Sequence, residues 1–525
     1  MRRTLKAAFQ AAVAAADPAV VLPPHLPLDL AGGRWGRVIV VGAGKAAEPM
    51  ARAAVAHLQR QHPHVRLEGV VVAPHLPPGT QPVVAVGRAR EVSVLRGAHP
   101  VPDEHGLAAT RRVMQLVAGA GPGDLVVVLL SGGGSALLTA PAGVTLERKA
   151  ALTRALLASG ATIAELNTVR KHLSAVKGGR LAALAAGNGA EVLTLAVSDV
   201  AGDDASTIAS GPTVPDPTTY QDALAVAERH VPHMTDVLTE LRAGAAGLRP
   251  ESPKPGDERL QRARYVLVAD PGSSVAAAKA VLEGAGVTVV DLGATLEGEA
   301  RVVGAEHATW VHAQLHAQVH AMAPAEVHAK TQGQAQAAAA GPVALLSGGE
   351  LTVTLTAAGQ ECAGAGTGRG GPNGEYALGL VAALARASGA AASANPTSGL
   401  GGAGFDLYVL AADTDGLDGG GSALNGSALN GSELNGPELA GSELAGPELM
   451  DPELPAAEPA ALAGAAGALF GPDELAAVEL RDVERALEEH DSHGYLQRMG
   501  GLFVTGPTGT NVNDLRIVLL VPAER

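Results

Sequence analysis

Several short polar motifs place charged or hydroxyl side chains beside glycines at the ends of apolar runs. They read Gly42–Lys45 (GAGK), Ser131–Ser135 (SGGGS), Ser198–Asp203 (SDVAGD), Ser347–Glu350 (SGGE), Gly366–Arg369 (GTGR) and Asp413–Gly416 (DTDG). Lysine, arginine and backbone amides neutralise a transferring phosphoryl group, while carboxylates hold Mg²⁺ or orient the attacking hydroxyl. Taken together, the motifs predict a phosphoryl-transfer site.

The first motif, Gly42–Ala47, has the spacing G-x-G-x-x-A between an expected strand and an expected helix. This spacing is typical of dinucleotide-binding turns, in which the helix N-terminus holds an anion. The acid that should hold a ribose hydroxyl is absent after the next strand, where Pro74 and His75 follow, and Glu68 precedes that strand. We expect Gly44 and Lys45 to hold a phosphate or carboxylate; a tight turn with a surface lysine is the alternative.

Two further segments favour binding of an anion. Three successive glycines let the backbone curl into a nest of amides, so Ser131, Gly132, Gly133, Gly134 and Ser135 are predicted to bind a phosphate or the substrate carboxylate. The second segment is expected to be a helix that places Asn167, Arg170, Ser174 and Lys177 near one face. This face either binds an anionic ligand or is an ordinary solvated basic surface.

Acidic residues follow expected strands in both halves of the chain. Asp199 is predicted to hold Mg²⁺ or to accept the proton of a substrate hydroxyl, with capping of the following helix as the alternative. Glu350 follows a glycine pair in the second half and is a second predicted Mg²⁺ ligand. Arg369 lies in a glycine-rich loop that also contains Asn373.

Apolar runs that alternate with helix-length segments predict the fold class. Val/Leu-rich runs at 37–41, 69–73, 125–130 and 191–197 are typical of parallel strands buried on both faces. A second series at 263–269, 287–291, 343–346 and 405–411 predicts another α/β domain. Residues 352–356 alternate with period two, which indicates an antiparallel strand or one with a single buried face.

The second sheet is therefore expected to be mixed. The sequence predicts a Rossmann-like N-terminal domain over residues 1–240 and a smaller α/β domain over residues 241–525.

Two segments are interpreted as insertions, at about 307–340 and 420–465, and neither is expected to take part in the chemistry. In the first, His312, His316 and His320 recur at i, i+4 and i+8, which indicates a solvated helix face or adventitious metal binding. In the second, residues 421–455 are seven near-copies of a five-residue unit (GSALN, GSALN, GSELN, GPELA, GSELA, GPELM, DPELP). A surface loop is favoured over a β-solenoid, because seven units form fewer than two coils.

Composition excludes several classes of protein. The formal net charge of −15 argues against a nucleic-acid or anionic-membrane binder, because each would need a basic face. The single cysteine, Cys362, excludes a disulfide framework and fits a reducing compartment. Without a long apolar run or a signal-peptide core, the chain is expected to be cytoplasmic.

In order along the chain, these motifs closely resemble the class II glycerate kinases, the family with a C-terminal MOFRL domain. The matching stretches are VVGAGKAA, AHPVPDEHG, SGGGSALL, LNTVRKHLSAVKGGRLA, SDVAGDDASTIASGPTVPDPTTY, PKPGD, LLSGGE, GRGGPNGEYALG, DTDGLDG and TGPTGTNVNDL. The resemblance implies phosphorylation of D-glycerate by ATP, typically at the 2-hydroxyl, with a requirement for Mg²⁺. It also implies a site between a Rossmann-like domain and a smaller one, and it is compatible with a homodimer.

The resemblance further implies roles for individual residues. Lys45 and Arg369 would be the essential cations that flank the transferred phosphoryl group, and Asp199, Glu350 and Asp415 would be acidic site residues. The chain departs from the family pattern after Asp418, where the five-residue repeats replace a short turn. Two other functions stay open: an NAD(P)H-dependent hydroxypyruvate reductase, and a non-catalytic sugar-acid-binding protein.

Overall fold

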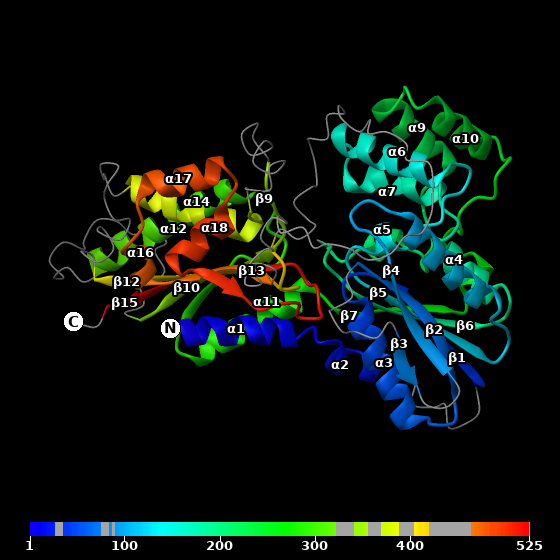
Figure 1. Cartoon of the computed structure of the whole chain (residues 1–525), viewed down its shortest axis with the longest axis horizontal. Helices are drawn as coiled ribbons and strands as arrows, with labels where there is room; N and C mark the ends of the chain where they lie inside the picture. Colours follow the sequence, from blue (N-terminus) through cyan, green and yellow to red (C-terminus); the bar gives the residue numbers. More distant parts are fainter. Residues whose placement is uncertain are drawn as a thin grey trace, which may run out of the picture.

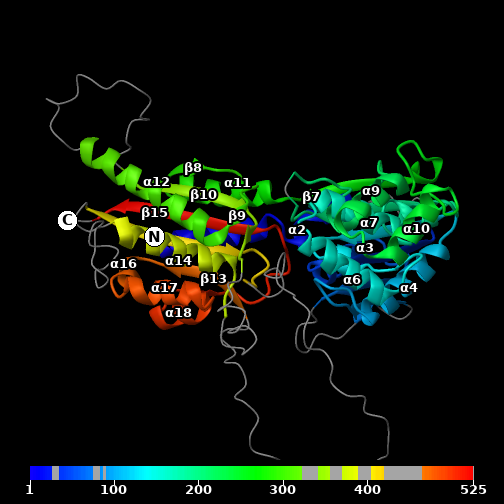
Figure 2. The same ribbon diagram turned by 90° about the horizontal axis from the view of Figure 1, so that it is seen from above.

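The computed structural model describes most of the chain, namely residues 1–26, 35–74, 83–86, 90–200, 202–321, 341–354, 369–387, 404–418 and 464–523. Figures 1 and 2 show two α/β domains side by side, each built on its own sheet. The α/β class and the two-domain architecture predicted from the sequence are therefore confirmed.

The N-terminal domain contains a seven-stranded sheet with the order β3-β4-β2-β1-β5-β6-β7. Its strands are β1 (Arg37–Ala43), β2 (Arg66–Ala73), β3 (Val83–Val86), β4 (Arg90–Arg96), β5 (Asp124–Leu130), β6 (Glu191–Val197) and β7 (Ala263–Ala269). All neighbouring strands run parallel except the edge pair of β3 and β4. The central strands are continuous apolar runs because helices cover both faces of the sheet.

Alternate residues of each strand supply the two cores of this domain. In β1, Val38 and Val40 pack with α2 (Pro18–Val21) and α3 (Ala47–Gln61), whereas Ile39 and Val41 face α4 (Glu104–Ala118) and α8 (Arg180–Ala186). Successive side chains point to opposite faces of a strand, so this alternation fixes the sheet between its two helical layers.

Four further helices form a cap with a core of its own. They are α6 (Leu146–Ala158), α7 (Ile163–His172), α9 (Tyr220–His230) and α10 (Thr235–Ala245). The helix α7 begins at a capping box, in which the Thr162 hydroxyl and the Glu165 carboxylate each accept a hydrogen bond from the other's backbone amide. In Figure 1, α6 and α7 lie on the side of the cap that faces the C-terminal domain.

The C-terminal domain contains a mixed six-stranded sheet with the order β14-β13-β12-β15-β10-β8. Its strands are β8 (Thr288–Asp291), β10 (Val343–Gly349), β12 (Phe405–Asp413), β13 (Ala465–Phe470), β14 (Leu502–Val504) and β15 (Asp514–Pro522). Only β8 and β10 pair in parallel within this sheet. The predicted mixed sheet is thus confirmed.

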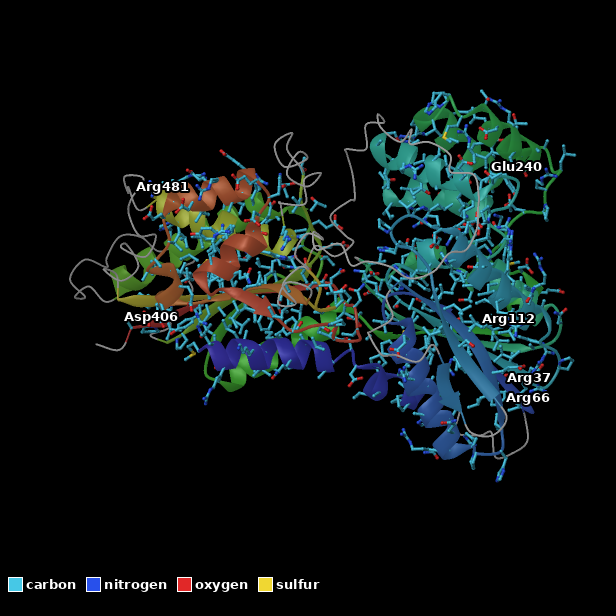
Figure 3. All side chains as sticks on the ribbon, viewed as in Figure 1. Arg37, Arg66, Arg112, Glu240, Asp406 and Arg481 are labelled. Carbon is cyan, nitrogen blue, oxygen red and sulfur yellow. The ribbon has the colours of Figure 1, made fainter. Side chains whose placement is uncertain are left out.

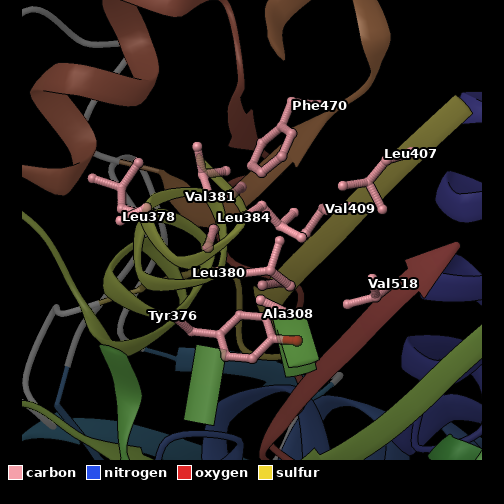
Figure 4. Close-up of a cluster of buried hydrophobic side chains, with 14 of the residues drawn as sticks. Ala308, Tyr376, Leu378, Leu380, Val381, Leu384, Leu407, Val409, Phe470 and Val518 are labelled. Atoms are coloured by element: carbon pink, nitrogen blue, oxygen red, sulfur yellow. The ribbon is translucent and has the colours of Figure 1, made fainter. Parts of the chain in front are cut away.

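Helices cover both faces of this second sheet as well. One face carries α12 (Ala300–Ala321), α14 (Pro372–Ala387), α17 (Leu480–Glu488) and α18 (Ser492–Met499), and Figure 4 shows part of the core that they form with β12 and β15. The other face carries α1 (Arg2–Ala14) and α11 (Pro271–Gly284). The short helices α5 (Gly134–Leu137) and α16 (Pro472–Leu475) lie at the ends of strands.

Two elements lie in a different domain from the one that a division at residue 240 implies. The helix α1 packs against the C-terminal sheet, where Phe9 meets Phe503 edge to face with ring centroids 5.2 Å apart. The strand at 263–269, assigned from sequence to the second series, is β7 and pairs with β6 of the first sheet. The chain therefore crosses between the domains near Asp17 and again near Asp270, and the division at 240 stays a prediction.

Two smaller expectations also change. In the described part of the period-two run at 352–356, Thr352 belongs to β11 (Leu351–Thr352), which pairs in parallel with β9 (Gly298–Glu299), so the antiparallel alternative is wrong there. Residues 355 and 356 lie outside the described part. The expected insertion at 307–340 begins as part of the fold, because α12 runs to Ala321 and buries Ala308, Val311 and Leu315 in the core. His316 and His320 carry no described side chains, and residues 421–455 fall outside the described part.

Across the described residues, no single helix is long and apolar enough to span a membrane, although the bent pair of α1 and the segment Pro18–His25 meets that test jointly.

Candidate active site

A cavity of about 490 Å³ lies between the two domains. On the N-terminal side it is formed at the carboxyl ends of β1, β5 and β6, where parallel α/β sheets bind their ligands. On the other side it is formed by the turns after β10 and β12 and by the segment before β15. Most of the motifs singled out from the sequence meet here.

Lys45 stands at the turn between β1 and α3 and reaches across the domain boundary. Its Nζ atom lies 2.8 Å from Oδ2 of Asp415, and the lysine side chain is 17% exposed. Burial alone would lower the pKa of Lys45, but the carboxylates of Asp415 and Asp413 outweigh it and raise the pKa above its usual value. Lys45 therefore carries a fixed positive charge at the cavity wall.

The turn after β5 is interlocked with the turn that bears Lys45. The Lys45 amide donates a hydrogen bond to the Gly132 carbonyl at 2.8 Å, and the Ala46 amide donates to Ser131 Oγ at 3.0 Å. Gly44 has φ = 147°, and a side chain there would collide with Ser131 Oγ. The amides of Lys45 and Ala46, just before α3, are therefore used within the protein, although the sequence suggested that this turn would hold an anion.

The predicted nest of glycines lies partly at the cavity. Gly132, Gly133 and Ser135 line it, whereas Ser131 and Gly134 lie behind the wall. Among the described residues, the amides of Gly132 and Gly133 donate no hydrogen bond. These two amides remain available to an anion, and the anion-binding role of this turn stays a prediction.

The basic segment after Leu166 divides into two parts. Asn167 and Arg170 lie on the cavity side of α7, as expected. The helix ends at His172, however, so Lys177 does not share that face and does not line the cavity. Its buried Nζ atom instead donates to the carbonyls of Ser135 at 2.8 Å and Leu138 at 3.1 Å, and burial lowers its pKa. Lys177 holds the glycine turn in place.

Carboxylates contributed by both domains form an acidic wall of the cavity. Asp199, which follows β6, accepts a hydrogen bond from Asn511 Nδ2 at 2.9 Å, and burial raises its pKa. Glu350 is exposed at the cavity, where desolvation by the surrounding protein raises its pKa to about 7 and repulsion from Asp199 and Asp514 adds to the effect. The ionised forms of both groups are thus destabilised until a cation arrives.

Sequence reasoning did not select the two acids that complete this wall. Asp413 and Asp514 face each other in register at the paired ends of β12 and β15, and burial raises the pKa of both carboxyls. The buried guanidinium of Arg516 donates to the Gly349 carbonyl at 2.9 Å and contacts Asp514. The motifs DTDG and TNVND contained the signal, but only the strand register shows that the two acids meet.

Asn373 and Arg369 flank the start of α14. Asn373 Nδ2 donates to Asp514 Oδ1 at 2.8 Å, and its amide donates to Asp418 Oδ1 at 3.0 Å, so it supports the acidic wall from behind. The Arg369 carbonyl accepts a hydrogen bond from the His493 amide at 2.9 Å, and Arg369 is not among the residues that line the cavity. Its predicted role as a phosphoryl-binding cation stays a prediction.

The residues of the acidic wall fit Mg²⁺ bound together with a phosphate. Carboxylate oxygens are the ligands that Mg²⁺ prefers. Desolvation raises the pKa of Asp199 and Glu350, so a bound cation would stabilise their ionised forms. In the described part of the chain, no three His, Cys, Asp or Glu side chains form a metal-holding group. Mg²⁺ is usually held by one or two carboxylates and completed by substrate phosphates and water.

Comparison with known proteins agrees with this description. Residues 4–242 match the family model of a domain of unknown function, DUF4147, and residues 462–514 match the MOFRL family. An Agrobacterium vitis protein named "Putative hydroxypyruvate reductase" is 38% identical over 99% of this chain and 94% of its own length. The D-glycerate 2-kinase of Thermotoga maritima is 33% identical over 95% of this chain and 92% of its own length.

A solved structure is also similar to this chain over almost its whole length. The crystal structure of a glycerate kinase from Thermotoga maritima matches with a TM-score of 0.67 and 30% identity, covering 99% of both chains. Fold, cavity and relatives together define a two-domain α/β phosphotransferase. More narrowly, the chain belongs to the glycerate kinase family that carries the MOFRL domain.

Proposed function

We propose that this protein is an ATP-dependent glycerate 2-kinase that converts D-glycerate to 2-phosphoglycerate with the assistance of Mg²⁺. The observation that carries the proposal is the cavity itself, in which Lys45 of one domain meets the acids Glu350, Asp413 and Asp514 of the other. Phosphoryl transfer needs positioning and charge neutralisation more than covalent help, and these residues supply both.

The residues can be assigned to the steps of the transfer. The oxygen of the substrate hydroxyl forms a bond to the γ-phosphorus as the bond from that phosphorus to the ADP oxygen breaks. Asp199 accepts the hydroxyl proton, and the burial that raises its pKa also makes it a better proton acceptor. Lys45 stabilises the charge that spreads over the phosphoryl oxygens. With Asp199 as the proton acceptor, Glu350 would hold Mg²⁺, which would supply positive charge to the phosphates.

The reductase named for the Agrobacterium vitis relatives would need a nicotinamide dinucleotide, and the turn at Gly42–Ala47 does not suit one. The amides of Lys45 and Ala46, which precede the helix, are already bonded to Gly132 and Ser131. Glu68, the acid nearest to the required position, lies at the far end of the sheet, where it accepts a hydrogen bond from Arg37 at 2.9 Å. Figure 3 labels Arg37 there, away from the other domain.

Two parallel assays test the proposal. Purified protein is mixed with Mg²⁺, ATP and D-glycerate, and release of ADP is followed by a coupled enzyme assay. Coupling the product to enolase without a mutase reveals 2-phosphoglycerate, because 3-phosphoglycerate gives no signal. Oxidation of NADH or NADPH by hydroxypyruvate is measured on the same sample. Activity in the second assay alone would overturn the assignment.

A third assay addresses the non-catalytic alternative. A sugar-acid-binding protein without activity would show glycerate binding by calorimetry but no ADP release, and Lys45→Met would have no turnover to reduce. A glycerate kinase shows turnover that falls steeply in the same variant.

A further inference from the structure

One wall of the cavity is apolar, in contrast to the acidic wall across from it. It is formed by the end of α6 and the first turns of α7, with Leu157, Ala161, Ile163 and Leu166 lining the space. Ile163 is the first residue of α7 and is 59% exposed, so it adds accessible apolar area to this wall.

The described residues of the C-terminal domain offer no matching apolar surface at the cavity. Of the ten described residues that this domain contributes to the lining, only Pro372 and Gly349 lack a polar side chain, and the others carry hydroxyl, amide or carboxyl groups. Closing the two domains on each other would therefore not bury the apolar wall favourably. A ligand with an apolar face would do so.

Arg170 lies on the same face of α7, two turns beyond Ile163. Among the described residues it donates no hydrogen bond and forms no ion pair, and burial lowers its pKa to about 10 without an acidic neighbour to oppose the effect. Lys149 and Lys177 lie near enough for the charge of Arg170 to lower the pKa of both. The inner end of α7 is thus a region of uncompensated positive charge.

The helix therefore presents an apolar surface at one end and a cation at the other. Seven residues of α-helix separate Ile163 from Arg170, which corresponds to about 10 Å along the axis. Glycerate is too short and too polar to use both ends. A nucleoside triphosphate has the required form, with a flat base and an anionic tail.

We propose that the purine base of ATP packs on Leu157, Ala161 and Ile163, and that Arg170 binds the phosphates, which extend toward Lys45 and the amides of Gly132 and Gly133. This assignment rests on the proposed kinase function and gives the nucleotide its direction in the cavity. It leaves the region near Asp199 and Asn511 for glycerate.

The test measures the binding of ADP and of inorganic pyrophosphate, each with Mg²⁺, by calorimetry. Ile163→Ser removes apolar surface at an exposed helix start where serine is tolerated, so the fold should persist. We expect Ile163→Ser to weaken ADP binding about tenfold and to leave pyrophosphate binding unchanged, because only ADP carries a base. Arg170→Met should weaken both ligands by a similar factor.

Leu248→Ser is the matched control, because Leu248 is 71% exposed and does not line the cavity. It should leave both affinities unchanged. Unchanged ADP affinity in Ile163→Ser would overturn the proposed base site, as would an equal loss for ADP and pyrophosphate. If the wild-type protein phosphorylates glycerate while either result is found, the kinase assignment stands and only the direction of the nucleotide is wrong.

Discussion

Gly132→Ala tests whether the position of Asp199 matters for catalysis. A Cβ atom at residue 132 would lie 1.7 Å from Asp199 Oδ2 and 2.3 Å from Asn511 Nδ2, whereas real Cβ contacts essentially never fall below 3.0 Å. The carboxylate must therefore retreat by at least about 1.3 Å, and its hydrogen bond to Asn511 must break or shift. The backbone of Gly132 is not in the left-handed region, so alanine introduces no backbone strain.

The expected effect follows from that displacement. A misplacement of about 1 Å in a reacting group costs on the order of 100-fold in rate, and loss of a hydrogen bond to a charged group costs about 1.5–3 kcal/mol. We therefore expect kcat for ATP-dependent glycerate phosphorylation to fall about 100-fold in Gly132→Ala, with thermal unfolding only slightly changed. Initial rates at saturating ATP and glycerate measure the first quantity, and circular dichroism measures the second.

Gly284→Ala serves as the control, because it ends α11 and a Cβ atom there would meet nothing within 4 Å. It should be neutral or stabilise the protein by up to about 1 kcal/mol. A kcat for Gly132→Ala within twofold of the wild-type value would refute the reasoning. So would a loss of activity that is fully explained by a lower fraction of folded protein.

Three other predictions concern charge and chain length. Lys45→Met should lower kcat by about 100- to 1,000-fold in the coupled ADP assay, because a cation at the developing charge is lost. Since the pKa of Glu350 is raised to about 7, folding takes up a proton there, so its contribution to stability falls as the pH rises from the unfolded pKa to about 7. Binding of Mg²⁺ and ADP at pH 6.5 should release that proton, as calorimetry in buffers of different ionisation enthalpy would detect, and Glu350→Gln should abolish the release. Replacing residues 421–455 with a short linker should leave kcat unchanged, because the Asp418 amide already donates to the Ala465 carbonyl at 2.8 Å; a tenfold fall in kcat would contradict this.

The sequence predicted strands well where burial on both faces makes them uniformly apolar, as in β1 and β5. It could not predict which sheet a strand joins, because β7 is defined by its pairing with β6 at a long sequence separation. The sequence also could not predict which of the two sheets α1 packs against. Its apolar face is visible from the spacing of Leu5 and Phe9, but the partner surface lies hundreds of residues away in the C-terminal domain.

The site was predictable as a set of motifs but not as a set of contacts. Lys45, Asp199 and Glu350 do meet in one cavity, as their order along the chain suggested. Lys177 and Arg170 are both cations of the same basic segment, and the sequence does not distinguish them. Because α7 ends at His172, Lys177 is buried and its Nζ atom donates to a backbone carbonyl. The sequence pattern therefore indicated the residue types of the site, but the point at which α7 ends determines that Arg170 lines the cavity and Lys177 does not.

The charges of the two walls bear on how substrates enter. The acidic wall repels a bare triphosphate. Desolvation, followed by repulsion from neighbouring carboxylates, raises the pKa of Asp413, Asp514 and Glu350. The opposite wall holds Arg170 without a partner among the described residues. On the proposed function, a nucleotide that carries Mg²⁺ satisfies both walls at once, because the metal faces the acids while the phosphates face the arginine. Nucleotide without Mg²⁺ should therefore bind weakly, because its phosphates meet the acidic wall without the cation that this wall lacks.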